Sequence, residues 1–242
     1  MKRVKSKFNK ALTGAIGGKS GLSLVELVIV VAIALTLVAV TGNALIHMYR
    51  ARANSASEKI SAAISQSKIN TLSGKKNKLV IYRDDRGDYY SQFYPVDHYE
   101  DLLDPSGNTV VDDRGDAVKD YSKPVFDEDN PYEQQKICEK NIDVFFRNLS
   151  NDPFQLAKSE KADSELLVYD KIEIEFSSQD GSVVAANRVT SIDNGLTFQA
   201  NSIITQGVSE EFNNQIRITV EEGTVVNITV YCLTGGIEPN GR

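Results

Sequence analysis

The chain has 242 residues, a formal net charge of −6, 41% hydrophobic residues and 25% charged residues, a composition typical of folded proteins rather than of disordered or collagen-like chains. From residue 74 onward it carries 31 acidic residues against 17 Lys or Arg, which disfavours non-specific binding to nucleic acid or anionic lipid. Two cysteines and two histidines leave few ligands for a zinc site or a dense disulfide framework.

The positive charge is concentrated at the N-terminus. Residues 1–21 contain six Lys or Arg and no acidic residue, and without them the net charge would be −12. Residues 22–40 are then apolar except Ser23, Glu26 and Thr36, a length that can span a membrane as a helix. We expect a single-pass protein whose basic N-terminus stays in the cytoplasm, while everything after about residue 45 lies outside it.

The junction between the basic and apolar segments differs from an ordinary secretory signal, because the small residues Ser20 and Gly21 precede the apolar run instead of following it. The sequence GLSLVELVIVVAIALTLVAV, with the residues around it from 19 to 50, resembles the leader and first helix of type IV pilins and pseudopilins. The resemblance implies that a prepilin peptidase cleaves between Gly21 and Leu22 and that the new amino terminus of Leu22 is methylated. Leu22 departs from the phenylalanine of the most familiar pilins but keeps the position hydrophobic.

Glu26 occupies the place of the glutamate at the fifth mature position of that family. It is the only charged residue between Leu22 and Tyr49, and a carboxylate in hydrocarbon costs about 3 kcal/mol or more. We therefore expect it to need a partner, and the nearest cation would be the amino group released at Leu22, on the same chain or on a neighbour. The resemblance implies the neighbour and makes Glu26 the filament-assembly residue. The alternative is a solvated glutamate at the membrane edge.

The helix is expected to continue beyond the membrane. Residues 45–72 contain no proline, and small or apolar residues recur there every three to four positions, as on the buried stripe of an amphipathic helix. The sequence thus predicts one helix over residues 22–73, with 22–41 in the membrane and the second half packed on a head. The predicted stripe comprises Tyr49, Ala53, Ala56, Ile60, Ala63, Ile64 and Ser67.

Strands are predicted to dominate the head, residues 74–242. Leu79–Tyr82 and Tyr89–Tyr94 flank a turn, and alternation of apolar with polar residues marks 172–176, 216–220 and 226–232. We expect an α+β, pilin-like fold in which a long N-terminal helix packs on an antiparallel β-rich head. Residues 176–183 and 216–237 are also similar in layout to H-type minor pseudopilins of type II secretion.

An acidic insertion is predicted at about residues 97–165. Asp97 to Asp129 contains 11 acidic and three basic residues, and the sequence DDRGD occurs at 84–88 and at 112–116. Three interpretations stay open: solvated turns, which Asp and Gly favour; calcium binding by Asp112, Asp113 and Asp116; and integrin recognition through Arg-Gly-Asp. Calcium is the one cofactor considered.

The two cysteines, Cys138 and Cys232, would both lie outside the cytoplasm, where disulfides persist. Asn130-Pro131 is typical of a helix start, so Cys138 is expected in a short helix, whereas Cys232 belongs to the last predicted strand. The resemblance to pilin heads implies a bridge between them, which would stabilise the fold by about 4 to 5 kcal/mol in the chain-entropy model. Two buried free thiols are the alternative.

No enzyme signature is present, and neither His47 nor His98 adjoins a plausible nucleophile. We therefore expect a non-enzymatic structural subunit, a minor pilin or pseudopilin, in a filament for adhesion or motility, protein secretion or DNA uptake. The resemblance implies as partners the prepilin peptidase, other pilin subunits, an inner-membrane assembly platform and, before assembly, lipid; direct nucleic-acid contact is not expected. The alternative is a non-polymerising, membrane-anchored extracytoplasmic binding protein or enzyme.

Overall fold

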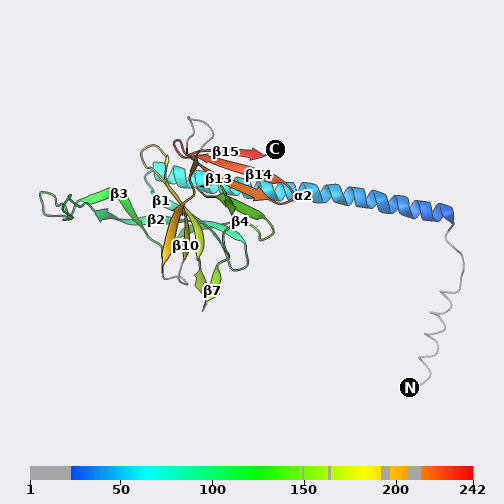
Figure 1. Cartoon of the computed structure of the whole chain (residues 1–242), viewed down its shortest axis with the longest axis horizontal. Helices are drawn as coiled ribbons and strands as arrows, with labels where there is room; N and C mark the ends of the chain where they lie inside the picture. The colour runs from blue at the N-terminus through cyan, green and yellow to red at the C-terminus, as the bar shows by residue number, and fades with distance from the viewer. Residues whose placement is uncertain (1–22, 149, 163–164, 192–196, 207–213, 242) are drawn as a thin grey trace, which may run out of the picture. The chain divides into compact units, whose positions relative to one another are not determined.

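Helix α2 runs from Leu24 to Leu72 and has residues in both units into which the chain divides, 1–47 and 48–242 (Figure 1). A computed structural model describes residues 23–148, 150–162, 165–191, 197–206 and 214–241. The predicted long N-terminal helix is confirmed from Leu24 onward. The predicted leader, with Gly21 and Leu22, lies outside the described residues.

The second half of α2 packs on the head through the predicted stripe. Six of the predicted residues are buried, and Tyr49 is half-buried. Ser57 and Thr71 are buried as well, because a stripe of small residues lets the helix backbone approach the strands closely. The six are Ala53, Ala56, Ile60, Ala63, Ile64 and Ser67.

The described strands form two larger antiparallel sheets and one short hairpin. The first sheet has the order β11-β10-β9-β1-β2-β3, with β4 also pairing with β2. Its strands are β1 (Asn77–Arg83), β2 (Tyr89–Asp101), β3 (Lys119–Phe126), β4 (Tyr132–Cys138), β9 (Asp170–Phe176), β10 (Val183–Ser191) and β11 (Phe198–Ser202).

The second sheet has the order β15-β14-β13-β5-β6, with β12 also pairing with β13. Its strands are β5 (Asp143–Arg147), β6 (Pro153–Phe154), β12 (Thr205–Gln206), β13 (Asn214–Glu221), β14 (Val225–Tyr231) and β15 (Gly236–Gly241). The hairpin pairs β7 (Glu160–Ala162) with β8 (Glu165–Leu167).

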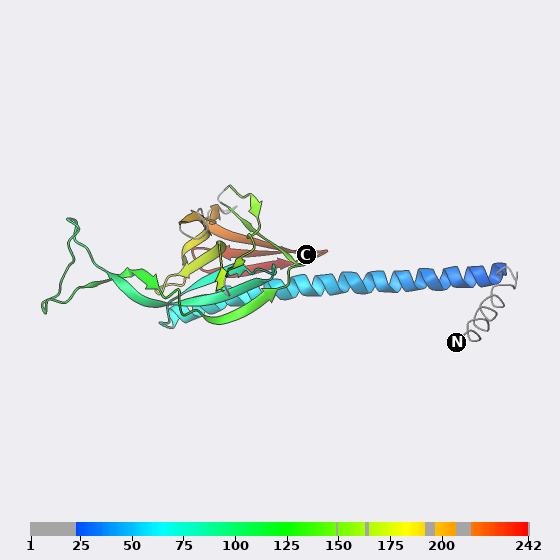
Figure 2. The same cartoon turned by 90° about the horizontal axis from the view of Figure 1, so that it is seen from below.

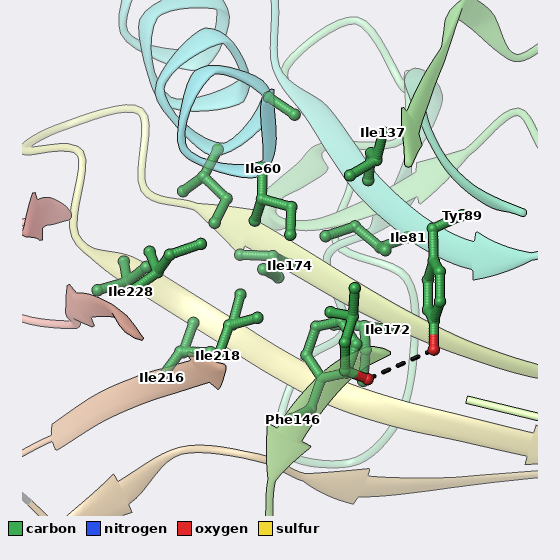
Figure 3. Close-up of a cluster of buried hydrophobic side chains, with 14 of the residues drawn as sticks. Ile60, Ile81, Tyr89, Ile137, Phe146, Ile172, Ile174, Ile216, Ile218 and Ile228 are labelled. Atoms are coloured by element: carbon green, nitrogen blue, oxygen red, sulfur yellow. Dashed lines mark hydrogen bonds between the residues drawn. The ribbon is translucent and has the colours of Figure 1, made fainter. Parts of the chain in front are cut away.

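The helix and both sheets share one hydrophobic core. Figure 3 shows Ile60 of α2 above Ile174 of the first sheet, with Ile218 of the second sheet beneath. The Tyr89 hydroxyl reaches across this core to donate a hydrogen bond of 3.4 Å to the carbonyl of Val144. The alternating patterns predicted at 172–176, 216–220 and 226–232 are confirmed, since their apolar members are all buried.

Two expectations about the middle of the chain change. Cys138 does not lie in a short helix but ends strand β4, where it pairs with Tyr89 of β2; burial of Ile137 and Cys138 against the core outweighs the local helix-start signal.

The stretch 97–165 is also more than a peripheral insertion. It supplies β5, whose Val144 and Phe146 are fully buried and which pairs with β13.

A buried cation fixes the turn after β3 to the first sheet. Lys78 is 6% exposed, and its Nζ lies 3.0 Å from Glu128 Oε1 and 3.2 Å from Glu173 Oε2. Burial alone would lower the pKa of Lys78, but the two carboxylates outweigh it and raise that pKa. Lys78 therefore stays charged and holds Glu128 against the sheet.

The β9–β10 and β14–β15 turns meet at two glycines. Gly235 has φ +57°, and a Cβ built on it would lie 2.1 Å from the carbonyl oxygen of Gly181, which itself has φ +71°. Lys68 of α2 crosses the same place, where its Nζ donates a 2.7 Å hydrogen bond to the carbonyl of Thr234. Only glycine fits at position 235, because the obstacle is backbone and not a mobile side chain.

Gly235→Ala should therefore lower the free energy of unfolding by about 2 to 4 kcal/mol, combining left-handed strain with overpacking. Gly107→Ala is the matched control, because Gly107 also has positive φ (+83°) but nothing within 4 Å, so only about 1 kcal/mol of strain is expected. Urea unfolding of the full chain in detergent measures both. Equal losses would contradict the close contact of the two turns.

Candidate functional site

The first half of α2 is apolar on every side. All residues from Leu24 to Ile46 are exposed, and the large hydrophobic side chains among them are between 47% and 79% exposed. A surface helix of a soluble domain keeps its apolar residues on one face, whereas a helix that is apolar all round needs lipid or other helices around it. This segment is the largest apolar surface among the described residues.

The same segment has the dimensions of a membrane span. At 1.5 Å per residue, Leu24 to Ile46 extends about 34 Å, compared with about 30 Å for the hydrocarbon core of a bilayer. Its mean hydropathy reaches 2.8 over an 18-residue window. The helix is therefore long and apolar enough to cross a membrane.

The two threonines of this half satisfy their hydroxyl groups within the helix. Thr36 Oγ1 donates to the carbonyl of Ile33 at 2.8 Å. Thr41 Oγ1 donates to the carbonyl of Leu37, also at 2.8 Å. Such bonds to the preceding turn lower the cost of placing a hydroxyl in an apolar environment.

The helix begins with a capping box formed by Ser23 and Glu26. The Glu26 backbone N–H donates to Ser23 Oγ at 3.2 Å, and the Ser23 backbone N–H donates to Glu26 Oε2 at 3.0 Å. Each side chain thereby satisfies a backbone donor that the first turn leaves unpaired. The spacing Ser-x-x-Glu at 23–26 is the signal that our interpretation of the sequence missed.

This arrangement gives the Glu26 carboxylate a hydrogen-bond partner within its own helix. Its Oε2 accepts a hydrogen bond from its own helix start, and its charge lies at the positive end of the helix dipole, which stabilises a carboxylate. Its other oxygen, Oε1, has no hydrogen-bond partner within the described ranges. Glu26 can thus cap its own helix and still offer an oxygen to a cation.

Ser23→Ala should fray the first turn of α2, because removing an N-cap oxygen costs about 0.5 to 2 kcal/mol. Hydrogen exchange of the full chain in micelles should show faster exchange of the Glu26 and Leu27 amides. Ser23→Asn, which retains a capping oxygen, should exchange like the wild type. Thr36→Ala is the control for losing a hydroxyl elsewhere on the helix; if it loosened the first turn equally, the capping box would not be the cause.

The two cysteines are not bonded to each other. Both are free and buried; Cys138 belongs to the first sheet, and Cys232 directly follows β14 of the second. Burial raises the pKa of Cys138 to about 12 and that of Cys232 to about 11. Of the two alternatives, the structure has the free thiols, and each stays protonated at neutral pH.

Because the thiolate is the reactive form, both cysteines should resist alkylation in the folded protein. At pH 8, iodoacetamide should modify neither thiol over a time in which an exposed thiol reacts completely, and should modify both once the chain is unfolded in urea. Intact-mass spectrometry counts the adducts. An unfolded, unreduced chain that takes up no label and weighs 2 Da less would instead show a disulfide.

The three aspartates considered for calcium lie on a loop between β2 and β3. Asp112 Oδ1 accepts the backbone N–H groups of Arg114 at 2.8 Å and Asp116 at 3.0 Å, and Asp84 likewise accepts the N–H of Asp88 at 2.7 Å. Both DDRGD copies are therefore side-chain-stabilised turns. The copy at 112–116 is exposed throughout, whereas Asp84 and Gly87 of the first copy are buried, so that copy is not a fully solvated turn. No group of three or more His, Cys, Asp or Glu suited to a metal occurs among the described residues; calcium binding stays an untested prediction.

The structure does not bring the predicted residues together into one site. Glu26 is in the first unit, Asp112 and the cysteines are in the second, and Gly21 and Leu22 lie outside the described residues. His98 Nδ1 contacts Asp97 Oδ2 at 2.7 Å, with both side chains more than half exposed. Comparison of the chain with protein-family models, curated proteins and solved structures finds no match. The functional conclusion must therefore come from the helix itself.

Proposed function

We propose that this chain is a structural subunit of a membrane-derived filament, similar to a type IV pilin or pseudopilin. A peptidase would remove residues 1–21 by cutting between Gly21 and Leu22, and α2 would wait in the membrane before it is extracted and packed against the helices of other subunits. The head, residues 74–242, would then form the outer layer of the filament. The observation that most supports this proposal is that the first half of α2 is apolar and exposed on all sides.

The energetics of such a transfer are compatible with this proposal. Moving an apolar helix from lipid into water would expose large side chains such as Leu24, Val38 and Val40, at about 25 cal/mol per Å² of apolar surface. Moving it from lipid into a bundle of equally apolar helices costs little hydrophobic free energy, because both surroundings exclude water. A helix apolar all round can exchange the one environment for the other.

Glu26 supplies the specificity that an apolar helix lacks. Its Oε1, which has no hydrogen-bond partner among the described residues, and its negative charge would pair with the amino group at Leu22 of a neighbouring subunit. That amino group exists only after cleavage. Unprocessed chains would offer no such cation, so processing and assembly would be coupled. The Ser23–Glu26 capping box would hold the carboxylate near the helix start in the meantime.

The test separates the charge of Glu26 from its capping role. Glu26→Gln keeps a side-chain oxygen that can complete the capping box but removes the charge, so it should stay in the membrane and enter sheared filaments at least tenfold less than the wild type. Glu26→Asp, which keeps the charge, should retain more incorporation. Normal incorporation of Glu26→Gln would refute the charge-pairing step.

Mass spectrometry of the native N-terminus tests the proposal as a whole. A chain that begins with a methylated Leu22 supports it. A native protein that keeps residues 1–21 would be the non-polymerising, membrane-anchored alternative, and the filament proposal would fail.

A further inference from the structure

A two-stranded arm extends from one end of the β1–β2 hairpin. Strands β1 and β2 pair from Asn77↔Pro95 to Arg83↔Tyr89; beyond Pro95, β2 continues and pairs with β3 up to Asp101↔Lys119. Figures 1 and 2 show this ribbon leading away from the other strands of the head. We call residues 97–125 the arm.

The arm is acidic and also exposes large apolar side chains. It contains eight Asp or Glu against three Lys or Arg, and two of its lysines already pair with acids of the arm itself, Lys119 with Asp101 and Lys123 with Glu100. Leu103 is 52% exposed, Val111 58% and Tyr121 72%. Apolar groups set among carboxylates suit a partner surface that is basic and hollowed, not one that is uniformly charged.

The opposite end of the same hairpin carries a cluster of basic residues, which we call the basic corner: Arg83, Arg86, Lys136, Lys140 and Lys158. They surround the turn at residues 84–88. Arg83 Nε donates to the Gly87 carbonyl at 3.0 Å, Lys136 Nζ lies 2.5 Å from Asp88 Oδ2, and a Cβ on Gly87 would lie 3.0 Å from Lys158 Cε and 3.2 Å from Lys140 Cβ.

Three cations of the basic corner remain available to a partner. Lys136 is paired with Asp88, and Asp84 is 8% exposed and accepts the Asp88 N–H. Arg86, Lys140 and Lys158 have no carboxylate within ion-pair distance in the part of the chain that the structure describes. They are not locked in ion pairs there, although Asp85 lies in the same turn and the charge of Lys140 helps to lower the pKa of Asp88.

A hollow of about 180 Å³ lies beside the basic corner. Its lining includes Ile137 and Ile142 together with Arg52, Lys59 and Glu139. Arg52 is paired with Glu222, and Lys59 Nζ donates to the Lys136 carbonyl at 3.2 Å. An apolar side chain next to carboxylates fits this hollow, whose lining is partly apolar and carries two cations and one acid. The arm offers that combination at Val111, which is followed by Asp112 and Asp113.

We infer that the arm of one copy of this chain docks on the basic corner of a second copy. The two surfaces lie at opposite ends of one hairpin, whose paired residues Asn77 to Arg83 alone span about 20 Å at 3.4 Å per residue. The contact is therefore heterologous, because it joins two different surfaces of the chain. This interface goes beyond the proposed packing of α2 helices. It involves only the second unit and requires neither cleavage at Gly21 nor a filament.

Disulfide trapping tests the contact on the full, uncleaved chain in detergent micelles. Val111→Cys and Lys158→Cys chains, mixed at low salt under mild oxidation, should form a mixed dimer at least tenfold more abundant than the dimers of either variant alone. Cys138 lines the hollow, so both chains also carry Cys138→Ser, and Cys232 is buried. About 1 M salt, where the screening length falls to about 3 Å, should abolish the product.

Charge exchange supplies the control. Asp113→Lys with Asp116→Lys, added to the Val111→Cys chain, leaves Asp112 to stabilise the turn and should remove the cross-link; Arg86→Asp with Lys140→Asp in the partner should restore it. Asp129→Lys, an exposed acid outside the arm, should have little effect. The inference would be overturned if the Val111→Cys and Lys158→Cys chains without charge changes formed no mixed dimer. It would also be overturned if the Asp113 and Asp116 reversals left the cross-link unaffected.

Discussion

The central constraint on this protein is that one continuous helix, α2, must be stable in an apolar environment along its first half and against a hydrated head along its second half. Up to about His47, α2 is apolar on all sides and needs a surrounding of hydrocarbon or other helices. From Tyr49 onward the β-rich head covers one stripe of small and apolar residues, and most other positions are polar. The change occurs within a single turn, without a break in the helix. The head can therefore be hydrated while the first half of α2, to which it is attached, stays out of water.

Local sequence was informative wherever one face of an element had to be buried. The stripe from Ala53 to Ser67 and the alternation at 172–176 or 216–220 followed directly from the periods of helix and strand, because burial on one side imposes those periods. The sequence likewise pointed to Glu26, since an isolated charge in an apolar run stands out. The Ser-x-x-Glu spacing at 23–26 is typical of a capping box, but Ser23 and Glu26 form one only because the helix begins at Leu24.

Features created by long-range pairing could not be read in this way. Asn130-Pro131 is a sound local signal for a helix, but the partner that makes Cys138 a strand residue is Tyr89, 49 positions earlier. Strand β5 looked like part of an acidic insertion, because nothing near Phe146 reveals its pairing with Ile218. Because the distance between Cys138 and Cys232 also depends on long-range pairing, the sequence left open whether they form a disulfide.

The stripe of α2 also determines how the head would bear force. Its buried contacts run parallel to the helix axis from Ala53 to Thr71, about 27 Å at 1.5 Å per residue, with Arg52–Glu222 at one end and Lys68–Thr234 towards the other. A pull along the helix loads these contacts in shear, so they resist together instead of opening one after another. Tension on the N-terminal half of α2 would thus be shared by all the contacts of the stripe at once.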